Sequence, residues 1–152
     1  MDKDIKTLHE ELESGSITSE ELVKEAIKDS YTAKDEYNAV VTVVDNASSK
    51  EVTNELLSGI PFACKDNYST AGILSTGSSN TLKDYVPFFT ATAIKNLESK
   101  GAVLVNKTAM DEFGMGGTGT TAHTGNILNP WDKTRMCAGS SSGSAAIVAA
   151  GL

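Results

Sequence analysis

Hydrophobic residues at helical spacing open the chain. Leu8 and Leu12 lie on one face of a helix, and a Gly/Ser break follows. The pattern restarts after Thr18, where Glu21 stands three residues on, as in a capping box that satisfies free N–H groups at a helix start. The spacing therefore predicts N-terminal helices within residues 1–30, with a scaffolding role.

Short apolar runs replace the helical pattern farther along. Two of them, AVVTVV (residues 39–44) and AVLVNK (residues 102–107), are rich in β-branched residues and typical of strands covered on both faces. GIPFACK is a third strand candidate, and TATAIKNLESKG predicts a helix that ends at Gly101. A Gly/Ser/Thr-rich crossover lies between Tyr68 and Phe89. The alternation of helices and buried strands predicts a single α/β unit.

Composition narrows the functional classes. The chain has 152 residues, of which 39% are hydrophobic, enough for a core. Its 13 basic and 20 acidic residues give a net charge of −7, which argues against a direct, sequence-independent grip on nucleic acid. No apolar run reaches the length of a membrane span, and the charged start is unlike a signal peptide. We therefore expect a cytoplasmic protein with no membrane partner.

The cysteines and histidines do not suggest a metal site. Cys64 and Cys137 stand among apolar or small residues, which favours reduced, buried thiols over a disulfide. Only His9 and His123 are available to complete a zinc site, so we expect no metal.

Lys65 is the first candidate for chemistry, because it stands at the end of a strand that should be buried. Burial makes a charge costly, so the lysine either finds a carboxylate, Asp66 being the nearest in sequence, or becomes a neutral amine that can act as a base. A third possibility is a strand-end lysine whose stem is covered and whose amine reaches solvent.

The Gly/Ser loop at residues 139–144 is the second candidate. Three adjacent serines precede an apolar helical run, so they could cap that helix, bind an anion at its N-terminus, or supply a reactive hydroxyl.

Other motifs are weaker. Residues 114–119 satisfy G-x-G-x-x-G, but no apolar strand precedes them, so a dinucleotide site is not supported. A phosphate-binding loop of the G-x-x-x-x-G-K-[ST] type is absent. A Ser-His-Asp triad would have to use His123, which has no evident orienting carboxylate.

The ordered motifs IPFACKDN, KTAMDEFGMG, NPWD and CAGSSSGSAA together resemble the amidase signature family. Within it, KTAMDEFGMG followed by NPWD is similar to the A subunits of aspartyl/glutamyl-tRNA amidotransferases. The resemblance implies the N-terminal part of a mixed-sheet α/β/α fold. Residues 1–152 would be an incomplete amidase signature domain, with the start of the sheet and the catalytic core at residues 38–152.

The resemblance also implies a Ser-cisSer-Lys mechanism without a cofactor. Lys65 would be the neutral general base, and Ser140 the bridging serine after a cis peptide bond. Met115 and Gly116 would line the amide pocket through their backbone. The substrate would be glutamine, the partners would be the B and C subunits, and charged tRNA would be reached through the complex rather than through this chain.

In the family, the nucleophilic serine and its oxyanion turn follow roughly two dozen residues after the bridging serine. That position lies beyond Leu152, so the chain resembles an N-terminal fragment that we expect to be inactive alone. The loop also departs from the family pattern, because Ala138 and Ser142 replace glycines. A fragment of a stand-alone amidase and a truncated, non-catalytic binding module stay open as alternatives.

Overall fold

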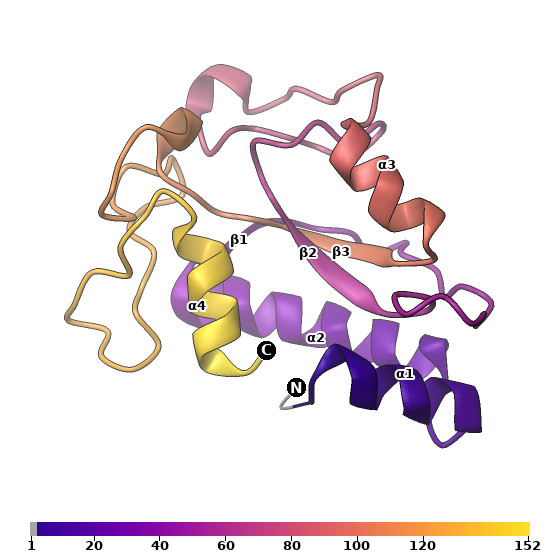
Figure 1. The fold of residues 1–152 in the computed structure, drawn as a ribbon. Helices are drawn as coiled ribbons and strands as arrows, with labels where there is room; N and C mark the ends of the chain where they lie inside the picture. The colour runs from indigo at the N-terminus through magenta and orange to yellow at the C-terminus, as the bar shows by residue number, and fades with distance from the viewer. Residues whose placement is uncertain (1–2) are drawn as a thin grey trace.

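A three-stranded mixed sheet forms the centre of the molecule (Figure 1). The computed structural model describes residues 3–152. The middle strand is β3 (Val103–Thr108), which is antiparallel to β1 (Val40–Val43) and parallel to β2 (Pro61–Lys65). The remaining elements are α1 (Ile5–Ser14), α2 (Ser19–Tyr37), α3 (Thr92–Ser99), α4 (Ser142–Ala150) and the short 3-10 helices η1 (Asn80–Leu82) and η2 (Glu112–Gly114).

The two N-terminal helices form where the sequence predicts them. The capping box at the start of α2 is present, since the Thr18 side chain accepts from Glu21 N–H and the Glu21 carboxylate accepts from Thr18 N–H. The second helix is longer than expected and ends at Tyr37, where Asn38 adopts a left-handed conformation with φ 53°. The predicted range 1–30 begins with residues 1–2, which lie outside the described part of the chain.

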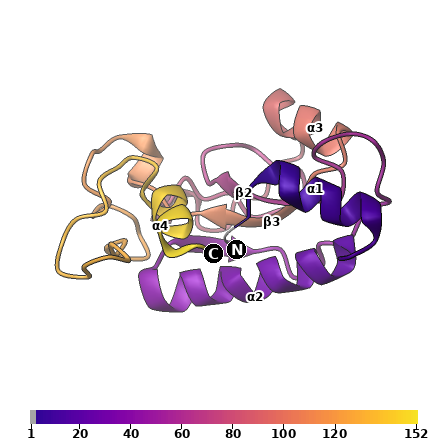
Figure 2. The ribbon, with the colours of Figure 1, turned by 60° about the horizontal axis from the view of Figure 1, so that its bottom comes forward.

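Helices cover both faces of the sheet (Figure 2). On one face Val23 of α2 packs against Val103 and Val105 of β3. On the other face Ile94 of α3 packs against Leu104 and a buried cysteine of β2. The mixed sheet between helical layers confirms the expected α/β fold class.

Burial, which the sequence predicts for the three strands, is complete only in β3. All six residues of β3 are buried, whereas β1 and β2 are partly exposed. In β2, Ala63 is exposed because it lines a groove between α2, α4 and the strand. The apolar runs therefore identified the strands correctly but not their surroundings.

The last helix, α4, packs beside α2 and over the carboxyl end of the sheet. Ala146 and Ile147 contact Ala33 of α2 and Val40 of β1 in one buried cluster. The approach is so close that a Cβ atom on Gly143 would lie 2.3 Å from a backbone carbonyl oxygen, so only glycine fits there. Within residues 3–152, no helix has both the length and the hydrophobicity to cross a bilayer.

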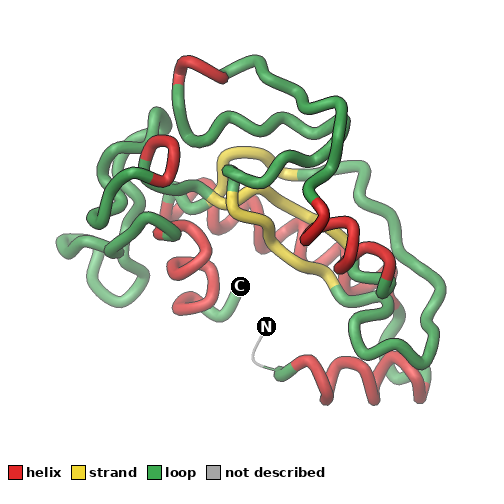
Figure 3. The backbone as a smooth tube through the Cα atoms, turned by 45° about the horizontal axis from the view of Figure 1, so that its top comes forward, coloured by secondary structure: helices red, strands yellow, loops and turns green. Residues whose placement is uncertain are grey.

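Two long loops follow the carboxyl ends of β2 and β3 (Figure 3). The first spans residues 66–91 and the second spans residues 109–141, each with one short 3-10 helix. Because parallel strands end at the same edge of a sheet, both loops start side by side. The start of α4 reaches the same edge.

Candidate active site

Lys65 and Ser140 meet at this edge of the sheet. Lys65 is the last residue of β2, and Ser140 lies two residues before α4 begins. The Lys65 Nζ atom donates a hydrogen bond to Ser140 Oγ at 2.8 Å, and both residues are half-buried. The fold therefore brings together the two residues that the sequence singled out.

The loop around Ser140 has an unusual backbone. The peptide bond between Gly139 and Ser140 is cis, as the resemblance implied. Ala138 has φ 60°, a left-handed conformation that glycine adopts more easily, and it stands where the family pattern has glycine. Ser142, the other departure from the pattern, is the first residue of α4, and its φ is not positive.

The neighbouring serines have different partners. Ser141 Oγ accepts a second hydrogen bond from Lys65 Nζ, also at 2.8 Å. Ser144 Oγ pairs with Thr108 Oγ1 at 2.8 Å on the side of β3. Ser141 is the N-cap residue of α4, yet its side chain makes no capping hydrogen bond. The possibility that the serines serve to cap this helix is therefore wrong for Ser141.

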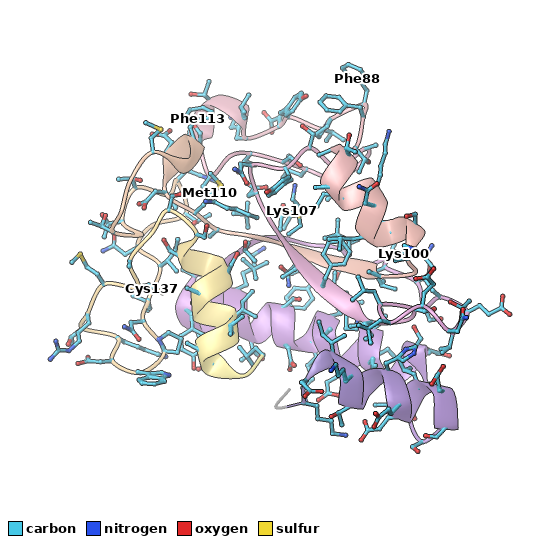
Figure 4. The ribbon with its side chains drawn as sticks, in the orientation of Figure 1. Phe88, Lys100, Lys107, Met110, Phe113 and Cys137 are labelled. Atoms are coloured by element: carbon cyan, nitrogen blue, oxygen red, sulfur yellow. The ribbon has the colours of Figure 1, made fainter. Side chains whose placement is uncertain are left out.

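Asp66 does not pair with Lys65, which corrects the pairing that sequence proximity suggested. Its carboxylate faces Lys107 instead, with Oδ1 at 3.7 Å from the Lys107 Nζ atom, and both side chains are fully buried. Three further oxygens accept from this amine: Tyr68 O, Thr70 Oγ1 and Ser75 Oγ. Figure 4 labels Lys107 near the centre of the molecule. Burial lowers the pKa of Lys107, and the Asp66 charge opposes that shift.

The pairing has a geometric cause. In the parallel register Cys64 is opposite Lys107, and Lys65 is opposite Thr108. Successive side chains of a strand alternate between faces, so the two lysines point to opposite sides of the sheet. Lys107 faces the crossover loop, whereas Lys65 faces α4. In the described part of the chain, Lys65 makes no ion pair.

Asp111 is a site residue that the sequence analysis missed. It is fully buried, and its backbone N–H donates to Ser140 O at 3.1 Å. Four groups of the following loop donate to its carboxylate: Thr118 N, Gly119 N, Thr120 N and Thr121 Oγ1. Burial would raise the pKa of Asp111, but the hydrogen bonds from Gly119, Thr121 and Thr118 outweigh it and lower that pKa.

The Asp111 carboxylate also shapes the serine loop. A Cβ atom on Gly139 would lie 2.0 Å from Asp111 Oδ2, and one on Gly116 would lie 2.5 Å from Asp111 Cγ. Both glycines are therefore required by this side chain. The segment that matches G-x-G-x-x-G thus wraps a carboxylate of its own chain. The acidic residue just before a Gly/Thr-rich run was the available signal.

The predicted pocket residues Met115 and Gly116 lie on the same loop. Met115 is 80% exposed, and its backbone N–H donates to Glu112 O, so that N–H is not free for a substrate. Gly116 packs against Asp111, which connects it to the Ser140 loop. That these two residues line an amide pocket stays a prediction.

The cysteines are poorly suited to act as nucleophiles. Burial raises the pKa of Cys64 to about 11, and it raises the pKa of Cys137 as well. Both thiols therefore stay protonated at neutral pH, and the thiolate is the reactive form. Cys137 lies beside the first turn of α4, where its thiol contacts Ser142 O (Figure 4).

Comparison with known proteins identifies the family of this chain. The family model described as Amidase matches residues 21–152. The chain belongs to the amidase family. Among curated amidase-family proteins, it is 44% identical over 158 aligned residues to the A subunit of the glutamyl-tRNA(Gln) amidotransferase of Streptococcus thermophilus. That alignment covers 98% of this chain and 32% of the relative.

Solved structures of the amidase family share the fold. The A subunit of the glutamyl-tRNA(Gln) amidotransferase of Thermotoga maritima superposes with a TM-score of 0.80 and 33% identity, over 97% of this chain and 33% of that one. The peptide amidase from Stenotrophomonas maltophilia superposes with a TM-score of 0.84 and 26% identity, over 99% of this chain and 34% of that one. This chain thus spans about a third of the length of the amidase-family relatives it matches.

Proposed function

We propose that residues 1–152 supply the base and the bridging serine of the A subunit of a glutamine-hydrolysing amidotransferase. The observation that carries this proposal is the 2.8 Å contact between Lys65 Nζ and Ser140 Oγ. The similarity to the A subunits of glutamyl-tRNA(Gln) amidotransferases supports glutamine as the proposed amide substrate. The released ammonia would be used to convert the misacylated Glu-tRNA(Gln) or Asp-tRNA(Asn) to Gln-tRNA(Gln) or Asn-tRNA(Asn).

Each group has a defined task in the proposed reaction. The neutral amine of Lys65 takes the proton of the Ser140 hydroxyl, and Ser140 takes the proton of a nucleophilic serine. The serine oxygen then attacks the side-chain amide carbon of glutamine. The proton returns through Ser140 to the leaving nitrogen, so ammonia departs and an acyl-enzyme ester forms. A water molecule hydrolyses the ester by the same relay and releases glutamate.

Several features support these roles for Lys65 and Ser140. Lys65 makes no ion pair within residues 3–152, so its amine contacts the serine hydroxyls and not a carboxylate. The backbone at Ser140 is held in place, because Asp111 N–H donates to its carbonyl oxygen. A relay of this kind needs the donor and the acceptor within hydrogen-bond reach.

The other catalytic groups and the tRNA-binding surface are proposed to lie outside residues 1–152. These catalytic groups are the nucleophilic serine and its oxyanion donors. The B and C subunits would receive the ammonia and bind the charged tRNA, which agrees with the net charge of −7 on this chain. The cytoplasm, where charged tRNAs are used, is the compartment that this proposal assigns.

The test is ammonia release from glutamine by the complete protein in its assembly. Lys65→Met and Ser140→Ala should each lower kcat by about a hundredfold or more, the scale of a lost general base. Lys100→Met is the matched control, because that exposed lysine pairs with Glu55 and precedes the amino end of β3, whereas Lys65 lies at the carboxyl end of β2. Full activity in both site variants would refute the relay.

A second experiment uses the 152-residue chain by itself. We expect no ammonia release from glutamine, because the proposed nucleophile is absent from it. Ammonia release by the pure polypeptide that disappears in Lys65→Ala would show that a nucleophile lies within residues 1–152.

A stand-alone amidase is the second candidate. It is favoured by the TM-score of 0.84 with the Stenotrophomonas maltophilia peptide amidase, which exceeds the 0.80 of the Thermotoga maritima protein. Turnover of a peptide amide by the complete protein without partner subunits would support this candidate. Glutamine turnover that requires the other subunits would support the amidotransferase.

A further inference from the structure

Ser141 holds the capping position of α4 without capping it. A serine at this position normally accepts a hydrogen bond from a free N–H in the first turn of its helix. Thr18 does so at the start of α2, and Ser79 does so at the start of η1. Ser141 makes no such bond, and its hydroxyl accepts from the Lys65 amine at 2.8 Å instead. The Ser141 side chain therefore contacts the candidate base and does not cap its own helix.

The number of N–H groups and lone pairs on an amine indicates how this contact can orient Lys65. A neutral amine carries two N–H groups and one lone pair, whereas an ammonium group carries three N–H groups and no lone pair. For Lys65 to act as a base, the lone pair has to face the Ser140 hydroxyl. An N–H group of the same nitrogen can then donate to Ser141. With both positions fixed, rotation about the last bond of the side chain no longer moves the lone pair away.

Few other groups restrain this nitrogen. Within residues 3–152, the hydrogen-bond partners of Lys65 Nζ are the two serine hydroxyls, and it makes no ion pair. Lysine has a flexible four-carbon stem, so a single hydrogen bond leaves the amine free to turn. Lys107 shows the contrast, because three oxygens accept from its amine.

We propose that Ser141 is the positioning residue for the general base: by accepting an N–H of Lys65, it directs the lone pair of that nitrogen onto Ser140. This role rests on the proposed function of Lys65. It separates the two serines, since Ser140 passes the proton and Ser141 orients the atom that takes it. Ser141 itself gains and loses no proton during the reaction.

The test compares three variants of the complete protein. Ser141→Ala should lower kcat for glutamine about tenfold or more while KM stays within about twofold, because positioning affects the chemical step. Its melting temperature should fall less than that of Ser144→Ala, because the hydrogen bond that it loses is exposed and no capping bond is lost. Ser141→Thr keeps the hydroxyl and should restore most of kcat. Ser144→Ala, on the same helix, should lower the melting temperature through loss of its bond to Thr108 and leave kcat unchanged.

A second readout does not depend on glutamine. Acylation of Lys65 by a water-soluble N-hydroxysuccinimide ester, measured by peptide mass spectrometry, reports how available the lone pair of its amine is to an external reagent. Ser141→Ala should raise the rate of acylation at Lys65 several-fold relative to Lys100, whereas Ser144→Ala should not. Unchanged acylation together with unchanged kcat in Ser141→Ala would overturn the proposal. A fall in melting temperature that accounts for the lost activity would also overturn it, since that is the behaviour of a cap.

The two proposals fail in different ways. If the wild-type assembly releases no ammonia from glutamine, the proposed function fails, and the acylation rates alone decide whether Ser141 orients Lys65. If ammonia release depends on Lys65 but not on Ser141, and acylation is unchanged, only the positioning role is wrong.

Discussion

Replacing Asp111 with asparagine tests the buried carboxylate that holds the loop at residues 118–121. The carboxylate accepts hydrogen bonds from Thr118 N, Gly119 N, Thr120 N and Thr121 Oγ1. Asparagine has only one accepting oxygen, so its amide group turns N–H donors toward at least one of the N–H groups of this loop.

The cost follows from the geometry. One buried donor left without an acceptor costs about 1–3 kcal/mol, and the remaining bonds to Asp111 lose the strengthening that comes from its charge. Together, the unpaired donor and the weaker remaining hydrogen bonds should lower the free energy of unfolding by about 3 kcal/mol. For a chain of this size that corresponds to a fall in melting temperature of about 6–12 °C. Asp132→Asn is the matched control, because Asp132 also accepts from a following turn, at Thr134 and Arg135, but is solvent-accessible.

The pH dependence gives the same experiment a second test. The pKa of Asp111 is lowered in the folded state from its ordinary value of 3.8. Its contribution is therefore fully present above pH 3.8 and is lost as the pH falls through the lower, folded-state pKa. Thermal melts followed by circular dichroism should show the wild type and Asp111→Asn converging in strong acid. Equal melting temperatures for Asp111→Asn and Asp132→Asn at neutral pH would refute the reasoning.

Three further substitutions test the packing. Gly143→Ala places a Cβ atom 2.3 Å from a backbone oxygen and should lower stability by about 3 kcal/mol in thermal melts, whereas Gly117→Ala, with nothing within 4 Å, should be nearly neutral; equal effects would contradict the close approach of α4. Lys107→Met leaves Asp66 buried without its cation and should cost about 3–5 kcal/mol in urea unfolding, part of which the second change Asp66→Asn should restore; no recovery would argue against the ion pair. Ser142→Ala removes a buried hydroxyl with no hydrogen-bond partner, so it should leave the melting temperature unchanged or raise it, and a clear fall would show that the hydroxyl has a partner.

Local chemistry was sufficient to predict much of the fold. Three features depend on neighbours in sequence and form: the Thr18–Glu21 capping box, the helix that stops before Gly101, and the strand predicted at residues 102–107, which the structure places at residues 103–108. The burial of β1 and β2 depends on which segments cover them from far along the chain. Periodicity alone does not contain that information.

The site was predictable only in part. Lys65 stands out as a charge at the end of an apolar run. The residues alone indicate only the Gly/Ser loop at residues 139–144, and the resemblance to the amidase signature family selects Ser140 within it. The ion pair of Asp66 was not predicted. The sequence left a pairing with Lys65 open as one alternative, whereas the alternation of strand faces places Lys107 beside Asp66. Asp111 was missed because most of its donors are backbone N–H groups, which residue types do not identify.

The register between β2 and β3 explains why length changes in these strands matter more than substitutions. Insertion or deletion of one residue in β2 after the register shift between Phe62 and Ala63 would turn Lys65 toward the crossover loop, away from the serines. A conservative replacement at Ala63 or Cys64 leaves the alternation intact. Within this segment, the proper spacing of residues along the chain is therefore under stronger constraint than the identity of most of them.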